Sequence, residues 1–298
     1  MKLFANNLET VKNNSFETKC ENIDKMLEFY IVKIKAQFEQ YNEEDIINID
    51  GSINTRRYII TNGGPFKKEE VKKDEKLKDG LMREWASDFY DLDIDASELE
   101  VEKATNNYYD LKKAGYGEKL EKLLFINLNR MLAPDYFVMH SSEYDDTANG
   151  IDFVIVEAST GIVACGFDGV YDEKEGERYK TKIKKLRKKA EKNGASIKYG
   201  FKFQNGKIIK QSLHNLPNLF LNMNLEDIRR MEKEMNFSYG DNQEPSEFEN
   251  EVFDRLLVSL EEQLDDFKSN EKVNSKVREN LDIFEKLVGT VKRRRESE

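Results

Sequence analysis

The chain of 298 residues contains only two cysteines, Cys20 and Cys165, and only two histidines, His140 and His214. Two cysteines are too few for a disulfide framework, so we expect two reduced thiols in a cytoplasmic protein. The scarcity of histidine argues against a His-rich zinc site and leaves carboxylates as the expected ligands of any metal. It also disfavours a Ser/His or Cys/His catalytic pair.

Long apolar runs and several common enzyme motifs are missing as well. No run of about 18 apolar residues occurs, which disfavours a transmembrane helix and a membrane partner. The N-terminal stretch MKLFANNLETVKNN lacks the apolar centre of a signal peptide. No Gly-Lys-Ser/Thr phosphate loop follows a strand, and no Gly-x-Ser-x-Gly elbow is present. These absences argue against enzymes that depend on such a phosphate loop or on such a nucleophile elbow.

Charge is distributed unevenly along the chain. The net charge is −10, which disfavours non-specific binding to nucleic acid. Residues 178–202, however, contain eleven Lys or Arg and a single Glu, a local charge of +10 that leaves −20 on the rest. A basic run on a helix is usually a solvated face, and the functional alternative is contact with phosphates.

Residues 1–107 are predicted to form a mainly helical N-terminal region. Apolar residues recur at helical spacing over 22–41, which predicts an amphipathic helix. Residues 57–61 predict a short strand before the Asn62-Gly63-Gly64-Pro65 turn. A charged helix is expected over 67–90, and the acidic segment 88–102 is expected to be a loop or weak helix.

Residues 108–237 predict an α/β (α+β) core with a mixed central sheet flanked by helices. Asn205-Gly206 marks a hairpin between 197–203 and 207–211. The other expected elements, in chain order, are a helix at 117–132, strands at 136–140, 152–158 and 162–168, a basic helix at 177–193, a strand at 219–221 and a helix at 225–235.

Residues 238–298 are predicted to form a linker at 238–247 and a C-terminal helical hairpin. The helices at 22–41 and 248–267 carry broad apolar stripes. These stripes could pack on the core or on a second subunit, so a homo-oligomer through helical arms is one expectation.

Acidic residues lie at the ends of two adjacent expected strands within 143–171, at positions suited to metal binding. Asp152 comes just after Asn149-Gly150, and Asp168 ends the next apolar run, 16 residues later. Two carboxylates and the Gly169 carbonyl would leave positions for water and a substrate phosphate on Mg²⁺. Asp152 could instead cap a turn, and Asp168 lies where turn chemistry also favours Asp. Asp145 and Asp146 are expected to be loop carboxylates more often than ligands.

Residues 117–222 resemble the core of the PD-(D/E)xK phosphodiesterase superfamily, and the Asn149 to Asp152 segment resembles uncharacterised bacterial members with an altered third motif. Glu121 after Gly117 matches the family's helix glutamate, Asp152 its aspartate and Asp168 the acid of its third motif. The resemblance implies a restriction-endonuclease-like core and a nuclease that uses Mg²⁺ or Mn²⁺. Glu121, Asp152 and Asp168 would hold the metal and, with a lysine, form the catalytic set.

The chain departs from that pattern two residues after Asp168, where the family's lysine is replaced by Val170. Either another element supplies the lysine or catalysis is impaired. The basic helix offers Lys180 and Lys182 near its edge facing the sheet, and we prefer Lys182 as the catalytic lysine.

Three functions remain open from the residues. The first is a divalent-metal-dependent nuclease, the second a nuclease-like binding module without catalysis, and the third a structural or interaction protein. Few aromatic residues interleave the basic run, so stacking of single-stranded bases is weakly supported. The residues expected to contact nucleic acid are Arg178, Lys180, Lys184, Lys185, Arg187 and Lys188.

Overall fold

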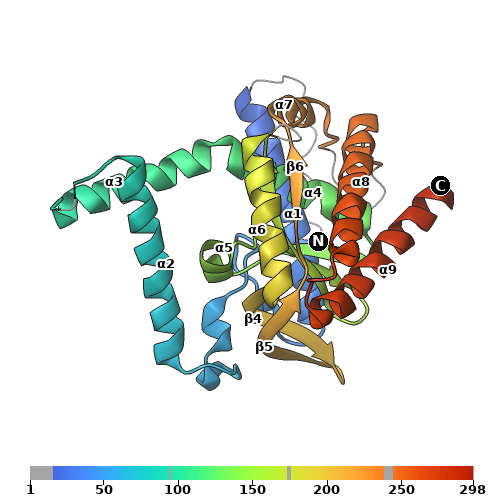
Figure 1. The fold of residues 1–298 in the computed structure, drawn as a ribbon, viewed down its shortest axis with the longest axis horizontal. Coiled ribbons are helices and arrows are strands. Elements are labelled where there is room, and N and C mark those ends of the chain that lie inside the picture. The colour runs from blue at the N-terminus through green and yellow to red at the C-terminus, as the bar shows by residue number, and fades with distance from the viewer. Residues whose placement is uncertain (1–15, 94, 173–175, 238–243, 298) are drawn as a thin grey trace, which may run out of the picture.

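The computed structural model describes residues 16–93, 95–172, 176–237 and 244–297 (Figure 1). The predicted linker at 238–247 therefore lies largely outside the described residues. Within the described part, no helix combines the length and the apolar character needed to cross a membrane.

The mixed α/β architecture expected from the sequence is confirmed. A four-stranded sheet has the order β1-β2-β3-β6, formed by Tyr136–His140, Phe153–Glu157, Val163–Tyr171 and Asn218–Met223. The first three strands form an antiparallel meander, and β6 pairs with β3 in parallel. A parallel pair needs a crossover connection, and α6 (Glu177–Lys192) lies in that connection.

A separate hairpin of β4 (Ala195–Gln204) and β5 (Lys207–Leu216) follows α6, turning at Asn205-Gly206 as predicted. Both turn residues have positive φ, 52° and 69°, which Asn and Gly tolerate best. After β6 come α7 (Leu225–Glu234) and two long helices, α8 (Glu247–Ser269) and α9 (Ser275–Ser297).

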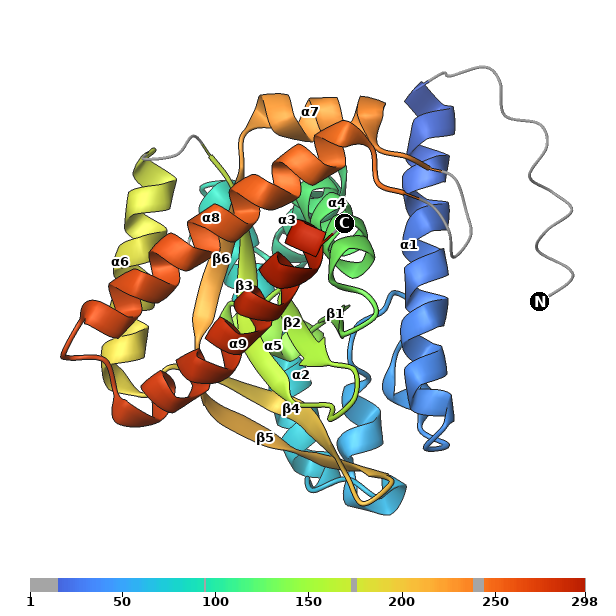
Figure 2. The ribbon, with the colours of Figure 1, turned by 90° about the vertical axis from the view of Figure 1, so that its right-hand side faces the viewer.

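The predicted C-terminal helices pack on the sheet. Figure 2 shows α8 and α9 crossing in front of β3 and β6. Phe284 of α9 meets Phe167 of β3 edge to face at 6.0 Å, and the Gln263 amide of α8 donates to the Phe220 carbonyl of β6. The predicted boundaries at residues 107 and 237 stay predictions, and α3 (Glu98–Ala114) runs across the first.

The apolar stripes of α1 (Phe16–Glu39) and α8 are buried within the chain. Phe38 of α1 is fully buried, and Leu256 and Phe267 of α8 are buried too. The same continuous apolar core includes α4 (Tyr116–Leu132) and the sheet. The predicted apolar stripes of these two helices are therefore covered by other parts of the same chain.

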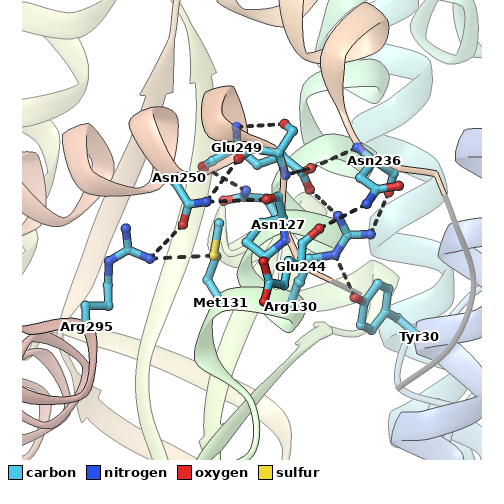
Figure 3. Close-up of polar contacts among 11 residues, drawn as sticks. Tyr30, Asn127, Arg130, Met131, Asn236, Glu244, Glu249, Asn250 and Arg295 are labelled. Atoms are coloured by element: carbon cyan, nitrogen blue, oxygen red, sulfur yellow. Dashed lines mark hydrogen bonds and ion pairs between the residues drawn. The ribbon is translucent and has the colours of Figure 1, made fainter. Parts of the chain in front are cut away.

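A buried ion pair joins α4 to α8 and the loop before it (Figure 3). Arg130 pairs with Glu249, and their side chains are 7% and 0% exposed. Arg130 also donates to the Tyr30 hydroxyl at 3.2 Å and the Asn236 carbonyl at 2.8 Å. Glu249 accepts from the backbone N–H of Asn236 and of Ser246. With these hydrogen bonds satisfied, this pair holds together α1, α4 and α8.

The N-terminal region differs from prediction at residues 57–61, where no strand forms. Two 3₁₀ turns, Thr55–Tyr58 and Ile60–Asn62, occupy this segment, with only an isolated bridge between Ile59 and Phe66. The Asn54 side chain caps the first turn by accepting from Arg56 N–H. The residues of this segment have a high strand propensity, but a strand also needs a neighbouring strand for its backbone hydrogen bonds. Local hydrogen bonds therefore form 3₁₀ turns here instead.

Helices α2 (Lys68–Phe89) and α3 form an arm whose far end, where the two helices meet, stands away from the body of the molecule in Figure 1. The first half of α2 packs on the body, where Asp74 contacts Lys198 and Tyr199 of β4. The predicted helix at 67–90 is confirmed as α2. The segment expected to be a loop or weak helix begins a full helix at Glu98, because Ser97 and Glu100 form a reciprocal capping box.

Candidate active site

Asp152 and Asp168 lie side by side across two antiparallel strands. Asp152 comes one residue before β2, and its N–H donates to the Phe167 carbonyl at 2.8 Å. Its Oδ2 accepts from the Gly169 N–H at 2.7 Å. The pairing of β2 with β3 thus brings the two predicted carboxylates to one place at the sheet.

The prediction that the strand ends at Asp168 is wrong. β3 continues to Tyr171 because β6 pairs with it in register, with Asp168 opposite Phe220 and Tyr171 opposite Met223. Asp168 therefore lies within a hydrogen-bonded strand and is 7% exposed. Turn chemistry does not account for an acid at this position, and Val170 lies inside the strand, partly buried against the core.

Lys182 reaches this site from α6 and forms an ion pair with Asp168. The exposed fractions of the two side chains are 28% and 10%. Burial is the main cause that lowers the pKa of Lys182. The carboxylate of Asp152 opposes this, while Lys185 and Lys189 reinforce it. An ammonium group is thus present beside Asp168, although it comes from a different element than the family pattern specifies.

A short helix, α5 (Glu143–Asn149), lies where the sequence predicted a loop. Ser142 caps it by accepting from Asp145 N–H, and Gly150 ends it with φ 62°, in the left-handed region. The Ser and Gly flanking these residues were the signal in the sequence for this helix. Because of α5, the adjacent Asp145 and Asp146 serve different purposes.

Asp145 is buried and accepts four hydrogen bonds. The donors are the Ser142 hydroxyl, the Asn149 amide, and the N–H groups of Lys198 and Tyr199 in β4, at 2.7, 2.7, 2.8 and 3.1 Å. These contacts occupy its oxygens and tie α5 to the β4–β5 hairpin. Asp145 is a structural residue that fixes the orientation of α5.

Asp146 shares a hydrogen bond with Asp152 and so joins the site. It was not among the expected metal ligands. Glu121 lies on α4 and interacts electrostatically with both residues. The tertiary structure therefore gathers Asp146, Asp152 and Asp168 around the ammonium of Lys182, and Glu121 lies beside Asp146 and Asp152.

The charged forms of these carboxylates destabilise one another. Burial raises the pKa of Asp152 well above the ordinary range, and the charges of Glu121 and Asp146 add to it. The Gly169 N–H and Lys182 oppose that rise. Burial, followed by Asp146 and Glu118, raises the pKa of Glu121 to about 8. Burial likewise raises the pKa of Asp146. Such clustering of raised carboxyl pKa values is typical of functional sites.

A row of basic side chains on α6 lies along the acidic cluster. Arg178, Lys182, Lys185 and Lys189 follow one another at i, i+4, i+7 and i+11, which is one face of a helix. Lys189 was not among the predicted residues. Its Nζ donates to the Asn149 carbonyl at 2.6 Å, at the last turn of α5. The Arg178 guanidinium lies over the Tyr171 ring at 4.8 Å, beside the end of β3.

The other predicted basic residues point elsewhere. Arg187 forms a two-bond ion pair with Asp266 of α8, with both hydrogen bonds at 2.7 Å. Lys180, Lys184 and Lys188 are exposed and repeat every four residues on a different side of α6 from the Lys182 row. The structure thus separates the predicted nucleic-acid contacts into a row beside the acids, an outer row and a structural arginine.

The residues predicted to be structural are packed in the core. His140 lies between the rings of Phe125 and Phe153, with centroids at 4.7 and 4.9 Å, and burial lowers its pKa to about 4. Cys165 is a buried free thiol. His214, in contrast, is exposed and contacts Ser196 across the β4–β5 hairpin.

Among the residues that the structure describes, no three His, Cys, Asp or Glu side chains are arranged ready to coordinate a metal ion. No protein-family model, curated protein or solved structure matches the chain. The interpretation of the site therefore rests on its geometry and electrostatics.

The raised carboxyl pKa values predict a specific pH dependence of stability. For Glu121 the unfolded chain releases its proton near 4.5 and the folded chain near 8, so the folded state binds more protons between these values. The free energy of unfolding must then fall as pH rises through this window. We expect a loss of about 2 kcal/mol, since each pKa unit corresponds to about 1.4 kcal/mol and Glu121 is only partly buried.

The measurement is the Tm at pH 5 and pH 8 with a chelator present, for the wild type and for Glu121→Gln. The variant should show a flatter profile because its amide does not titrate. A Tm that rises between these pH values, or an equal slope in both proteins, would contradict the prediction.

Proposed function

We propose that this chain is a divalent-metal-dependent nuclease that hydrolyses phosphodiester bonds in DNA or RNA. The observation that carries the proposal is the cluster of Glu121, Asp146, Asp152 and Asp168 together with the Lys182 ammonium. Burial raises the pKa of Glu121, Asp146 and Asp152, and the nearby carboxylates add to the rise at Glu121 and Asp152. A divalent cation would relieve this repulsion.

The order of elements supports a restriction-endonuclease-like core for this nuclease. A helix bearing a glutamate (α4) precedes the antiparallel meander β1-β2-β3, followed by α6 and a parallel β6. The aspartates come from the start of β2 and from within β3. This agrees with the resemblance stated from the sequence, with the lysine moved from the strand to α6.

The donor set fits Mg²⁺ or Mn²⁺, which prefer carboxylate oxygens and retain water ligands. Asp152 and Asp168 would be the primary ligands, with Glu121 and Asp146 beside them. The bound metal would lower the pKa of a water molecule and neutralise charge on the phosphate. For Asp168 to bind it, Lys182 must leave its ion pair and would then be free to position water or the phosphate.

The row Arg178, Lys185 and Lys189 supports binding of a polyanion beside this cluster. These side chains lie on the same face of α6 as Lys182. Phosphate contacts from such a row would hold a nucleic-acid backbone over the carboxylates. The second candidate, a nuclease-like module that binds without cleaving, is favoured by the engagement of Asp168 with Lys182 and by Val170.

The test is cleavage of single- and double-stranded DNA and RNA in Mg²⁺ and in chelator, with Glu121→Gln as the variant. We expect metal-dependent cleavage by the wild type and a loss of roughly 10–100-fold in the variant, as for groups that tune a metal site. Glu191→Gln is the matched control, because Glu191 is exposed in the last turn of α6 and accepts from the Asn270 amide.

Salt-dependent binding without any cleavage would favour the binding module instead. Cleavage that persists in chelator, or an equal loss in both glutamine variants, would reject the proposed site.

A further inference from the structure

The far end of the α2–α3 arm carries a concentrated acidic surface. We define the acidic tip as residues 88–93 and 95–102. It contains seven carboxylates and no Lys or Arg, and all seven acidic residues are exposed. In the described part of the chain, Asp88, Asp91, Asp93 and Asp95 form no ion pair. Glu98 pairs with Arg83 of α2, and the other acids of the tip form a cluster of one sign.

Two large apolar side chains are exposed within this acidic tip. Phe89 is 59% exposed and Leu99 is 75% exposed. The Phe89 ring touches the rings of Tyr90 and Tyr108, with centroids at 5.1 and 5.5 Å, so its position is defined. Exposed apolar groups rimmed by charges are typical of protein-binding surfaces, where aromatic residues act as anchors.

A complementary surface exists on the outer side of α6. Lys180, Lys184 and Lys188 are exposed, and within the described residues none of them pairs with a carboxylate, in contrast to Lys182 and Arg187. Lysines four residues apart on a helix are separated by about 6 Å along its axis. Glu98, which also pairs with Arg83, and Glu102 have the same spacing on α3, so the two rows are opposite in sign and equal in period.

A hollow with a partly apolar lining lies beside the first turn of α6. A cavity of about 420 Å³ lies between α6, β6, α7 and α8 and is bordered by Tyr179, Leu256 and Val258. Val258 is 53% exposed there. Asp227 and Asp254 also line the cavity, and they form ion pairs with Arg255 and Arg295. The surface around α6 therefore offers exposed cations and a hollow with room for an apolar side chain.

We propose that the partner of the acidic tip is a second copy of this chain, with the tip of each copy on the outer side of α6 of the other. The tip cannot reach α6 of its own chain, since α3 leads directly into α4 through Gly115 and holds the tip away from the body (Figure 1). Reciprocal contacts of this kind close a twofold dimer. The inference does not depend on catalytic activity.

The kinds of contact expected between the two copies predict a weak dimer whose stability depends on salt. Exposed ion pairs are individually weak, so a few of them alone cannot hold two chains together. Burial of Phe89 in the hollow adds stabilisation in proportion to the apolar surface removed from water. We expect a Kd in the micromolar range, about −8 kcal/mol, that weakens with salt because exposed charges are screened.

The experiment is sedimentation velocity of the full chain over a range of concentrations, at low and at high salt. We expect the mass to move toward that of a dimer at low salt. Asp93→Lys with Glu102→Lys should weaken association at least tenfold, and so should Lys184→Glu with Lys188→Glu. The four changes combined should restore association, because the charges are exchanged between the two surfaces.

The matched control is Glu271→Lys with Glu279→Lys, which changes the net charge equally at exposed positions near the α8–α9 connection. It should leave association unchanged. Phe89→Ser should weaken association without altering charge. A chain that stays monomeric at low salt, a control that weakens association equally, or a combined variant that fails to associate would each overturn the proposal.

Discussion

Asp152→Asn is expected to abolish metal-dependent cleavage while leaving the fold at least as stable as in the wild type. The asparagine keeps the size of the side chain but loses its negative charge. A metal ligand would be weakened at the centre of the carboxylate cluster, and we expect turnover to fall about 10³-fold, or about 4 kcal/mol of transition-state stabilisation.

The stability of this variant should change in the opposite direction to its activity. The amide oxygen introduced at position 152 can accept from the Gly169 N–H, as the Asp152 carboxylate does now, and the new NH₂ group can donate to Asp146. Removing one of several repelling carboxylates at pH 8 should stabilise the metal-free protein by about 1 kcal/mol, roughly 3 °C in Tm for a chain of this size.

The measurements are turnover in Mg²⁺ and thermal unfolding in chelator at pH 8. The matched control is Asp145→Asn. It alters the neighbouring hub of four hydrogen bonds and should lower the Tm, because Asp145 accepts from two backbone N–H groups of β4. If Asp152→Asn keeps full turnover, Asp152 is not a ligand. If its Tm falls like that of Asp145→Asn, Asp152 serves the fold.

Lys182→Met should lower turnover by about 10²–10³-fold, in the range found when a positioned charged group is removed from an active site. Methionine retains the apolar stem of the side chain and removes the ammonium. The ammonium now pairs with Asp168, so its loss leaves a nearly buried carboxylate without its cation. The metal-free variant should therefore be less stable than the wild type.

Metal binding separates the two roles of Lys182. Because its ammonium competes with a cation for Asp168, Lys182→Met should bind Mg²⁺ more tightly and gain more Tm from it than the wild type. Calorimetric titration with Mg²⁺ and single-turnover cleavage measure the two effects. Lys184→Met, on the outer side of α6, should change neither. Weaker Mg²⁺ binding together with unchanged turnover would remove Lys182 from the proposed mechanism.

Local patterns in the sequence predicted most of the helices and strands. Apolar residues at helical spacing located α1, α4 and α8, and Asn205-Gly206 located the β4–β5 hairpin. Each of these signals depends on a few neighbouring residues. An Asn-Gly turn or an apolar helical stripe therefore predicts the same local structure whatever the fold. The failed strand at 57–61 shows the limit, because a strand needs a partner that its own residues do not specify.

The candidate site was predictable only in part, for the same reason. Asp152 and Asp168 flank apolar runs, so their proximity followed once the runs were taken as adjacent strands. Asp146 was missed because its contribution depends on α5, whose orientation Asp145 sets through hydrogen bonds to residues more than fifty positions later in the chain. Lys189 contacts Asn149 across a similar separation.

The sequence by itself determined the mixed α/β composition, the basic helix and the two strand aspartates, since each is expressed in spacing along the chain. Tertiary structure alone decided that Lys182 lies against Asp168, that Asp146 joins the cluster, and that the stripes of α1 and α8 are covered within one chain. It also decided that α2 and α3 form an arm with an exposed tip. Such contacts arise from the packing of distant elements, which local periodicity does not encode.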